Sequence, residues 1–296
     1  MKILVTGGTG FVGSRIVHAL RAEGRDVRAL VRRPDHGAHL SSLGAELATG
    51  DVTDAASLTA AADGCTHVIH LVAILKGSPQ DFERVMTQGT RNTIAAAKNA
   101  GAQRFTLMSA LGTTATTKDL VPYYGAKFAM EQDTVASGLE YTIFRPSFVF
   151  GRGGALATFM KQVRYSPVVT VIGSGRQQIQ PIWIDDVAEH FARALDTPAA
   201  ANKTFEIGGP DIVTWDELYR TIAKVLGKHR ALAHIPAALA RSGARATQWI
   251  PTAPLSADQV AMIEAGDNIV TNPDAVHTFQ LPLVPLEDQI RRAAGT

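Results

Sequence analysis

A tyrosine and a lysine lie four residues apart in this sequence, at Tyr123 and Lys127. On a helix, side chains at positions i and i+4 share a face, so the phenol and the ammonium would be neighbours. A free phenol has a pKa of about 10, and a positive charge beside it favours the phenolate. In the direction of carbonyl reduction, the same phenol donates a proton to the carbonyl oxygen. The pair indicates acid–base chemistry, although the same spacing also occurs by chance on exposed helical faces.

Ser109 stands at the end of a predicted strand and could hold the reacting oxygen through its hydroxyl. The catalytic residues expected from the sequence are therefore Ser109, Tyr123 and Lys127.

A glycine-rich loop follows the first predicted strand and opens a predicted helix. Its glycines fit both G-x-G-x-x-G and G-x-x-G-x-x-G, and glycine lets backbone N–H groups approach a pyrophosphate closely. The amino end of the helix adds unpaired N–H groups and a positive dipole. We expect a dinucleotide here, rather than a glycine-rich turn without a ligand. The residues expected to hold its phosphates are Gly7, Gly8, Thr9, Gly10, Phe11, Val12 and Gly13.

The second predicted strand ends at Val31 and continues into Arg32 and Arg33, with no acidic residue at that point. An acid there would accept hydrogen bonds from the ribose of NAD(H), whereas arginine favours a 2′-phosphate. The sequence predicts NADP(H) in preference to NAD(H). The alternative is that both arginines are solvated residues near a helix start.

Further cofactor contacts are expected where later strands end. Asp51 follows the third strand and could accept a hydrogen bond from the adenine amino group, or could be an ordinary turn or capping residue. The fourth strand ends in a segment expected to pass behind the cofactor. The other expected contacts are Val52, Leu71, Val72, Ala73, Met108, Tyr123, Lys127, Pro146, Phe148 and Val149.

The elements that position these residues alternate between strand and helix. Short apolar runs at 2–6, 27–31, 47–49, 66–72, 104–108 and 141–144 indicate strands buried on both faces. Helical patterns lie between them at 11–23, 55–62, 81–100 and 123–137. This alternation predicts an α/β fold with a doubly wound parallel sheet, the Rossmann arrangement, over residues 1–150.

The pattern changes after residue 150. Strands are expected at 168–172 and 178–184, joined by a turn at 173–175, and at 204–207. Helices are expected at 187–194, at 215–226 and in a group from 231 onward. We interpret 151–296 as a smaller substrate-side lobe interleaved with the last strands of the sheet.

Several motifs, in order, make the chain resemble the extended or atypical branch of the short-chain dehydrogenase/reductase superfamily, which contains the NAD-dependent epimerases and dehydratases. They are the glycine loop, Tyr-x-x-x-Lys, Arg145-Pro146-x-x-Val149-Phe150-Gly151 and Ile184-Asp185-Asp186-Val187-Ala188. Met108-Ser109-Ala110-Leu111-Gly112 and the C-terminal part look most like the complex I accessory-subunit group and its bacterial relatives. The resemblance implies a bound NAD(P) and, where catalysis occurs, the set Ser109, Tyr123 and Lys127. Epimerases commonly carry a run of Ser/Thr where this chain has Ser109-Ala110.

Five weaker signals have structural interpretations as well. Asp186 is expected to cap a helix with Glu189 rather than to form an acid/base pair with its neighbour, and Thr214-x-x-Glu217 reads as a second capping box. Arg145 is expected to tie the end of the sixth strand to its surroundings. Arg176 could reach a substrate anion or be a solvated turn residue, and 231–269 could line a lipophilic pocket or pack as ordinary helices.

The composition excludes several classes of protein. Lys+Arg 29 against Asp+Glu 27 gives a charge of +2 without a like-charged block, so a nucleic-acid surface is not expected. Cys65 is the only cysteine, which fits a reducing cytoplasm, and with no basic partner expected nearby it reads as a packing residue. No apolar run reaches the roughly 18 residues of a membrane span. The nine histidines give no metal-ligand spacing.

The sequence therefore predicts an NADP(H)-dependent oxidoreductase acting on a carbonyl or a secondary alcohol of a small-molecule substrate. One alternative is an accessory or sensor protein that holds NADP(H) without turnover, with a respiratory complex as its candidate partner. A sugar-nucleotide epimerase or dehydratase is the other. The sequence does not decide between a monomer and a homodimer.

Overall fold

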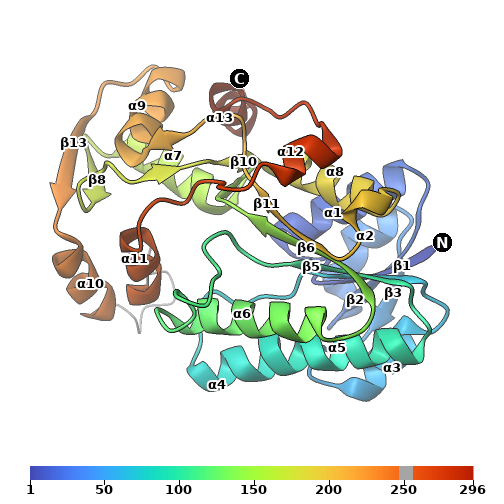
Figure 1. Cartoon of the computed structure of the whole chain (residues 1–296). Coiled ribbons are helices and arrows are strands. Elements are labelled where there is room, and N and C mark those ends of the chain that lie inside the picture. Colours follow the sequence, from blue (N-terminus) through green and yellow to red (C-terminus); the bar gives the residue numbers. More distant parts are fainter. Residues whose placement is uncertain (247–255, 296) are drawn as a thin grey trace. The chain divides into compact units, whose positions relative to one another are not determined.

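Seven strands form one sheet in the order β11-β6-β5-β4-β1-β2-β3, and every neighbouring pair is parallel. The computed structural model describes residues 1–246 and 256–295 (Figure 1). The expected doubly wound parallel sheet is confirmed. Its strands are β1 (Lys2–Thr6), β2 (Asp26–Val31), β3 (Glu46–Thr49), β4 (His67–His70), β5 (Arg104–Met108), β6 (Glu140–Pro146) and β11 (Lys203–Ile207).

Helices cover both faces of this sheet, with α3, α5 and α6 on one side and α1 and α8 on the other (Figure 1). The helix expected at 81–100 is built from α4, a π-helical turn and α5 rather than from one regular helix. The helical elements of this part are α1 (Phe11–Ala22), a 3₁₀ helix η1 (Pro34–Gly37), α2 (Ala38–Ser42), α3 (Ala55–Ala62), α4 (Pro79–Phe82), the π-helical turn (Glu83–Thr87), α5 (Gln88–Asn99), α6 (Pro122–Val135), α8 (Ile184–Ala194), a 3₁₀ helix η3 (Pro198–Ala200) and α12 (Asp274–Phe279).

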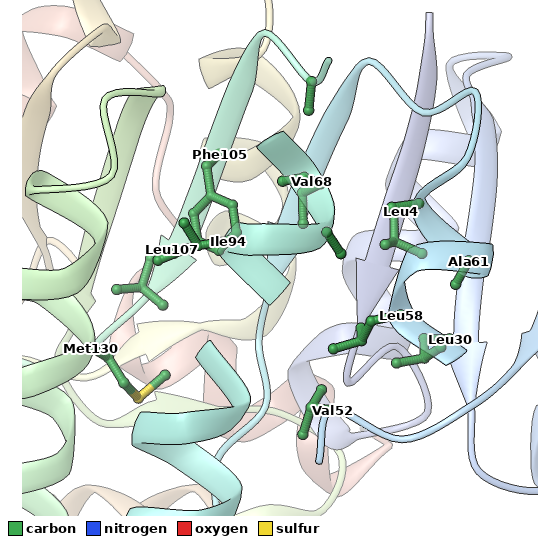
Figure 2. Packing of buried hydrophobic residues seen from close by; sticks show 14 of the residues in the cluster. Leu4, Leu30, Val52, Leu58, Ala61, Val68, Ile94, Phe105, Leu107 and Met130 are labelled. Atoms are coloured by element: carbon green, nitrogen blue, oxygen red, sulfur yellow. The ribbon is translucent and has the colours of Figure 1, made fainter. Parts of the chain in front are cut away.

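Apolar side chains between the sheet and the first of these helical layers form a large core cluster (Figure 2). Leu4, Val68 and Phe105 come from the adjacent strands β1, β4 and β5, and each is at most 1% exposed. Ile94 of α5 and Met130 of α6 pack against them. The central strands β1, β4 and β5 are buried on both faces, which favours apolar sequences, whereas no residue of the edge strand β3 is buried.

The opposite face is held by α1 and α8, which pack closely together. Arg15 of α1 donates from Nε to Oδ1 of Asp185 at 2.7 Å. The expectation that Asp186 caps this helix was wrong, because α8 begins at Ile184 and Asp186 lies inside its first turn. Glu189 is paired with Arg193 at 2.7 Å instead of completing a capping box.

The chain divides into two compact units, and each unit is built from three separate segments of the sequence. The first comprises 1–146, 184–207 and 272–282, and the second comprises 147–183, 208–271 and 283–296. Residues 147–150, expected in the first domain, thus fall in the second unit, and α8, β11 and α12 return to the first.

The second unit contains three two-stranded sheets and five helices within the described residues. Its elements are β7 (Val149–Phe150), α7 (Gly154–Tyr165), β8 (Val168–Ile172), β9 (Gln178–Ile179), β10 (Ile182–Trp183), β12 (Val213–Thr214), α9 (Trp215–Val225), β13 (Ala231–Ile235), α10 (Ala237–Ala246), α11 (Ala257–Glu264) and α13 (Leu286–Ala294). The capping box at Thr214 and Glu217 is confirmed, since each side chain bonds the other residue's backbone N–H. No helix in the described part of the chain is long and apolar enough to cross a membrane.

Two expectations for this unit were wrong. The strands on either side of the 173–175 turn do not pair as a hairpin, because β8 pairs in parallel with β13 while β9 pairs with β12 and β10 with β7. The C-terminal group from 231 opens with a strand, β13, rather than a helix. The candidate lipophilic segment 231–269 includes residues 247–255, which lie outside the described residues.

Aromatic packing joins α8, β11 and α12 to β6 within the first unit. The ring of Phe144 in β6 lies 4.7 Å from that of Phe191 in α8, 5.8 Å from that of Phe205 in β11 and 5.8 Å from that of Phe279 in α12. The ring of Phe144 is fully buried. Segments separated by more than a hundred residues thus share one aromatic core.

We expect Phe144→Ala to lower the free energy of unfolding by about 3–5 kcal/mol, because it removes the centre of this ring cluster. Val135→Ala is the control, since Val135 is 48% exposed and its truncation should change stability by less than about 0.5 kcal/mol. Urea titrations followed by circular dichroism measure both. Similar small changes for the two variants would show that the cluster does not stabilise the unit.

Candidate functional site

The expected site residues of the first unit gather where its parallel strands end. From β1 the chain winds outward in one direction through β2 and β3, and in the other through β4, β5 and β6. The loops after β1 and β4 therefore diverge, and such a switch point is where doubly wound sheets bind their ligands.

The glycine loop is shaped by contacts that exclude a Cβ atom. Gly7 has φ +77°, and a Cβ on Gly13 would lie 2.2 Å from the carbonyl oxygen of Gly7. The N–H of Gly10 donates to that same oxygen at 3.0 Å. Within the described chain no side chain caps the amino end of α1, which begins at Phe11. The backbone donors at this end and the space left by the glycines fit a pyrophosphate.

The loop is also pressed against the segment after β4. A Cβ on Gly7 would lie 3.1 Å from the carbonyl carbon of Leu71 and from the backbone nitrogen of Val72. The N–H of Leu71 donates to the carbonyl oxygen of Thr6 at 3.1 Å. Leu71 is buried, Val72 half-buried and Ala73 exposed. The loop and this segment therefore lie together.

A buried histidine ties these two strands together, and the sequence analysis missed this role. The Nδ1 atom of His70 lies 2.7 Å from Oγ1 of Thr6, and its Nε2 lies 3.0 Å from Oγ1 of Thr90 in α5. Since the Thr90 hydroxyl donates to the carbonyl oxygen of Met86, it accepts from Nε2, and Nδ1 accepts from Thr6. Burial, together with the positive charge of Lys127, lowers the pKa of His70 to about 3, so the ring is neutral.

Arg32 and Arg33 follow β2 and are both exposed. Asp51, after β3, accepts on Oδ1 from the N–H and the hydroxyl of Thr53 at 2.8 and 2.7 Å. Burial acts to raise the pKa of Asp51, but these hydrogen bonds and the charge of Arg32 outweigh it and lower the pKa. Asp51 is therefore a charged turn residue, and its neighbour Val52 is buried.

Tyr123 and Lys127 lie on one face of α6, with Nζ of the lysine 5.8 Å from the centre of the tyrosine ring. Lys127 is fully buried, and its Nζ donates to the carbonyl oxygen of Met108 at 2.6 Å. Burial lowers the pKa of Lys127 to about 7, although the charge of Glu131 acts in the opposite direction. Burial raises the pKa of Tyr123, so the phenol keeps its proton at neutral pH.

Ser109 directly follows β5 and is only 1% exposed. Its N–H donates to the carbonyl oxygen of Phe144 at 2.7 Å, while its Oγ has no hydrogen-bond partner among the described residues. A buried hydroxyl without a partner is uncommon and marks a place where a ligand can supply one. Pro146, at the end of β6, is buried.

Glu131 was not recognised in the sequence, although it lies four residues beyond Lys127 and so on the same helical face. Its carboxylate is 3% exposed and accepts from Nε and Nη2 of Arg145 at 2.9 and 2.6 Å. These hydrogen bonds raise the pKa of Arg145. The expectation that Arg145 ties the end of β6 to its surroundings is confirmed, and its partner is the helix that carries Tyr123 and Lys127.

The structure does not bring all expected residues into one unit. Phe148 and Val149 belong to the second unit, where Phe148 packs edge-on against Trp215 at 5.2 Å. Arg176, also in that unit, is exposed. No cluster of metal-binding side chains occurs among the residues that the structure describes.

Cys65 is buried, and this burial raises the pKa of its thiol. Both observations agree with a packing role. The expectation that it has no basic neighbour was wrong, because Nη1 of Arg28 lies 3.8 Å from its sulfur.

A family model for the NAD dependent epimerase/dehydratase family matches residues 3–208. The chain belongs to this family. The match spans the glycine loop, the Tyr–Lys helix and β11, so the expected epimerase/dehydratase branch is confirmed.

Some relatives with assigned names are reductases of different compounds, and others are photosystem II assembly factors. A ceramide reductase from Caulobacter vibrioides is 32% identical over 251 residues, which cover 83% of this chain and 78% of that protein. An NAD(P)H azoreductase from Xenophilus azovorans is 26% identical over 234 residues, covering 76% of this chain and 74% of that protein.

Solved structures share the fold at lower identity. An NADPH-dependent quinone oxidoreductase from Escherichia coli, complexed with NADPH, matches with a TM-score of 0.79 at 22% identity, covering 97% of this chain and 98% of that one. The triphenylmethane reductase of Citrobacter sp., complexed with NADP(H), matches with a TM-score of 0.79 at 20% identity, covering 99% and 100%. These two structures thus share the fold described above.

We expect Glu131→Gln to lower the free energy of unfolding by about 2–3 kcal/mol, because it leaves a half-buried guanidinium without its carboxylate. Arg145→Met should cost a similar amount. The double variant should cost less than the sum of the two, with a coupling of about 1 kcal/mol or more. Denaturant titrations of the four proteins measure the coupling, and strictly additive losses would contradict a stabilising ion pair between α6 and β6.

Proposed function

We propose that this protein is an NADP(H)-dependent reductase that converts a carbonyl group to a secondary alcohol. The observation that carries the proposal is the fully buried Lys127 beside Tyr123. At the end of the adjacent strand β5, the hydroxyl of Ser109 has no hydrogen-bond partner in the part of the chain that the structure describes. The glycine loop lies at the switch point of the same sheet.

The residues present fit a dinucleotide. The glycine loop, Gly7, Gly8, Thr9, Gly10, Phe11, Val12 and Gly13, would hold its pyrophosphate, and Arg32 and Arg33 would hold the 2′-phosphate. Asp51 and Val52 would lie at the adenine, while Leu71, Val72 and Ala73 would pass behind the cofactor. Met108, Pro146, Phe148 and Val149 are proposed as further contacts. When bound, NADPH supplies the hydride for the reduction.

The protein's own groups would provide the proton and hold the oxygen. The hydroxyl of Ser109 donates a hydrogen bond to the carbonyl oxygen, which supplies the partner that its buried Oγ lacks. Tyr123 donates its phenolic proton to that oxygen, which completes the alcohol and leaves a phenolate. The ammonium of Lys127 stabilises this phenolate and, in our proposal, also binds the nicotinamide ribose.

The identity of the substrate is suggested by the relatives. Ceramide carries a secondary alcohol, and the relative named for it is 32% identical over most of this chain. We therefore propose a ketone with long apolar chains as the substrate class.

The two alternatives receive less support. Relatives named as reductases support turnover, whereas relatives named as photosystem II assembly factors support the accessory alternative; none of these names refers to complex I. The position after Ser109 is Ala110, which provides no second hydroxyl for an epimerase.

We expect Tyr123→Phe to lower kcat by about 100-fold or more while leaving the Kd for NADPH within about twofold, because only the proton donor is removed. NADPH oxidation is followed by absorbance with a panel of long-chain ketones, short ketones and quinones. Turnover that survives the substitution would remove Tyr123 from its role. NADPH binding without turnover on any compound of the panel would favour the accessory protein.

We expect the double variant Arg32→Ala/Arg33→Ala to weaken NADPH binding by about 100-fold while changing NADH binding by less than about threefold, because only NADPH carries the 2′-phosphate. Calorimetry or fluorescence titration of both nucleotides measures the two losses. Equal losses for NADPH and NADH would contradict the assignment of these arginines.

A further inference from the structure

Two long stretches of the sequence contain no acidic residue. Five lysine or arginine residues lie between Glu140 and Asp185, and six lie between Glu217 and Asp258. The net charge of the whole chain is only +2, so the excess is balanced elsewhere in the sequence. The fold brings parts of the two stretches together in the second unit, where α7 packs on α9 and β8 pairs with β13 (Figure 1).

Arg230 joins the two stretches at the end of α7. Its Nε donates to the carbonyl oxygen of Val163 at 2.7 Å, and its Nη2 donates to that of Arg164 at 3.3 Å. These carbonyl groups belong to the last turn of the helix, where a positive charge is favourable. The loop before β13, which contains Lys228 and His229, therefore lies beside the end of α7.

Three exposed basic side chains at this place have no carboxylate partner among the described residues. Lys161 and Arg164 lie three positions apart, so they share one face of α7. Lys228 lies in the loop that Arg230 holds. Their positive charges are therefore available to a ligand outside the chain.

The carboxylates of two neighbouring helices are paired with other cations. Asp216 of α9 lies 3.2 Å from Nη2 of Arg220, and Glu287 of α13 lies 2.8 Å from Nζ of Lys224. These two acids consequently leave the positive charge at the end of α7 without a counter-ion.

Apolar side chains are exposed among these cations. Tyr165, the last residue of α7, is 76% exposed, and Val168 at the start of β8 is 43% exposed. Val168 is in register with Ala231 of β13, which is exposed as well, so both belong to the outer face of this two-stranded sheet. Exposed apolar side chains with a polar rim indicate an interaction surface.

We call the surface around the end of α7 the basic face, and it comprises Lys161, Arg164, Tyr165, Val168, Lys228 and Ala231. We propose that the basic face binds membranes that contain anionic lipids. The cations contact the lipid headgroups, and the tyrosine and the valine enter the region between headgroups and acyl chains. Tyrosine suits this depth because its ring is apolar and its hydroxyl is polar.

Other occupants fit the basic face less well. A second copy of the chain pairing through the same face would bring like charges together. A nucleic acid would satisfy the cations, but a valine and an alanine between them offer it no hydrogen bonds. The proposal goes beyond the reductase activity and does not depend on it.

Vesicle flotation of the full chain tests the proposal, with phosphatidylcholine vesicles that contain either no phosphatidylglycerol or about 30% of it, at about 0.1 M salt. We expect the natural protein to bind the anionic vesicles at least about tenfold more tightly than the neutral ones. Arg164→Gln/Lys228→Gln should weaken binding to the anionic vesicles about 25-fold, because each basic residue near such a surface contributes about fivefold. Tyr165→Ser should weaken it about fivefold, and added salt should change this factor little, because the contribution is apolar.

Lys203→Gln/Arg292→Gln is the matched control. It removes one exposed lysine from β11 and one exposed arginine from α13, and it should change binding by less than about twofold. Circular dichroism checks that every variant is folded. Equal losses in the two double variants would overturn the proposal, as would a natural protein that does not bind the anionic vesicles.

A labelled RNA or DNA duplex provides the remaining comparison. Tighter binding to the duplex than to the vesicles, lost in Arg164→Gln/Lys228→Gln but unchanged in Tyr165→Ser, would replace the membrane by a nucleic acid and overturn the proposal. No readout involves NADPH, so the membrane-binding proposal and the proposed reductase activity can fail separately.

Discussion

Backbone-to-backbone contact at the end of β1 is the constraint on which the rest of the site depends. The chain turns at Gly7 and comes back so closely that Gly13 touches the Gly7 carbonyl group, and the same turn lies against the backbone of Leu71 and Val72. Only residues without a Cβ allow this geometry. The start of α1, the segment after β4 and the backbone donors of the loop are all positioned by it. The neutral His70 also stabilises the end of β1, because it forms hydrogen bonds with both Thr6 and Thr90.

The burial of two charged side chains on α6 is the second feature that determines the geometry of the site. Lys127 and Glu131 are each at most 3% exposed, and each is compensated: the lysine by the carbonyl oxygen of Met108, the glutamate by Arg145. The partners come from the ends of β5 and β6, so the rotation of the helix is set by both strands. A buried pair of this kind is costly to break from one side, and it therefore favours one orientation of α6 over its alternatives.

The sheet could be predicted because its central strands β1, β4 and β5 are buried on both faces and helical patterns separate the strands, so most strands can be recognised from their own sequence. The loop and the Tyr–Lys pair were predicted for the same reason, since their geometry follows from spacing within one element. Glu131 could have been found from helical spacing as well. The partner of His70 could not be predicted, because Thr90 lies twenty residues away in the sequence and contacts His70 only in the folded structure.

Prediction was weaker in the second unit, where long-range pairing decides the structure. The glycines at 173 and 175 do form a turn, but β8 finds its partner in β13, more than fifty residues later. The alanine-rich sequence of β13 has no strand pattern of its own, so its conformation depends on that partner. Strands of two residues, such as β9 and β10, leave too short a pattern to be recognised.

The interleaving of the two units has a consequence for how the protein is made. A nascent chain that has emerged only to the end of β6 carries an unpaired sheet edge and an uncovered Phe144, because β11, α8 and α12 are encoded much later. The Rossmann unit therefore cannot finish folding on the ribosome until α12 has been translated. Until then the exposed strand is open to pairing with other chains, which gives molecular chaperones a reason to act on this protein during its synthesis.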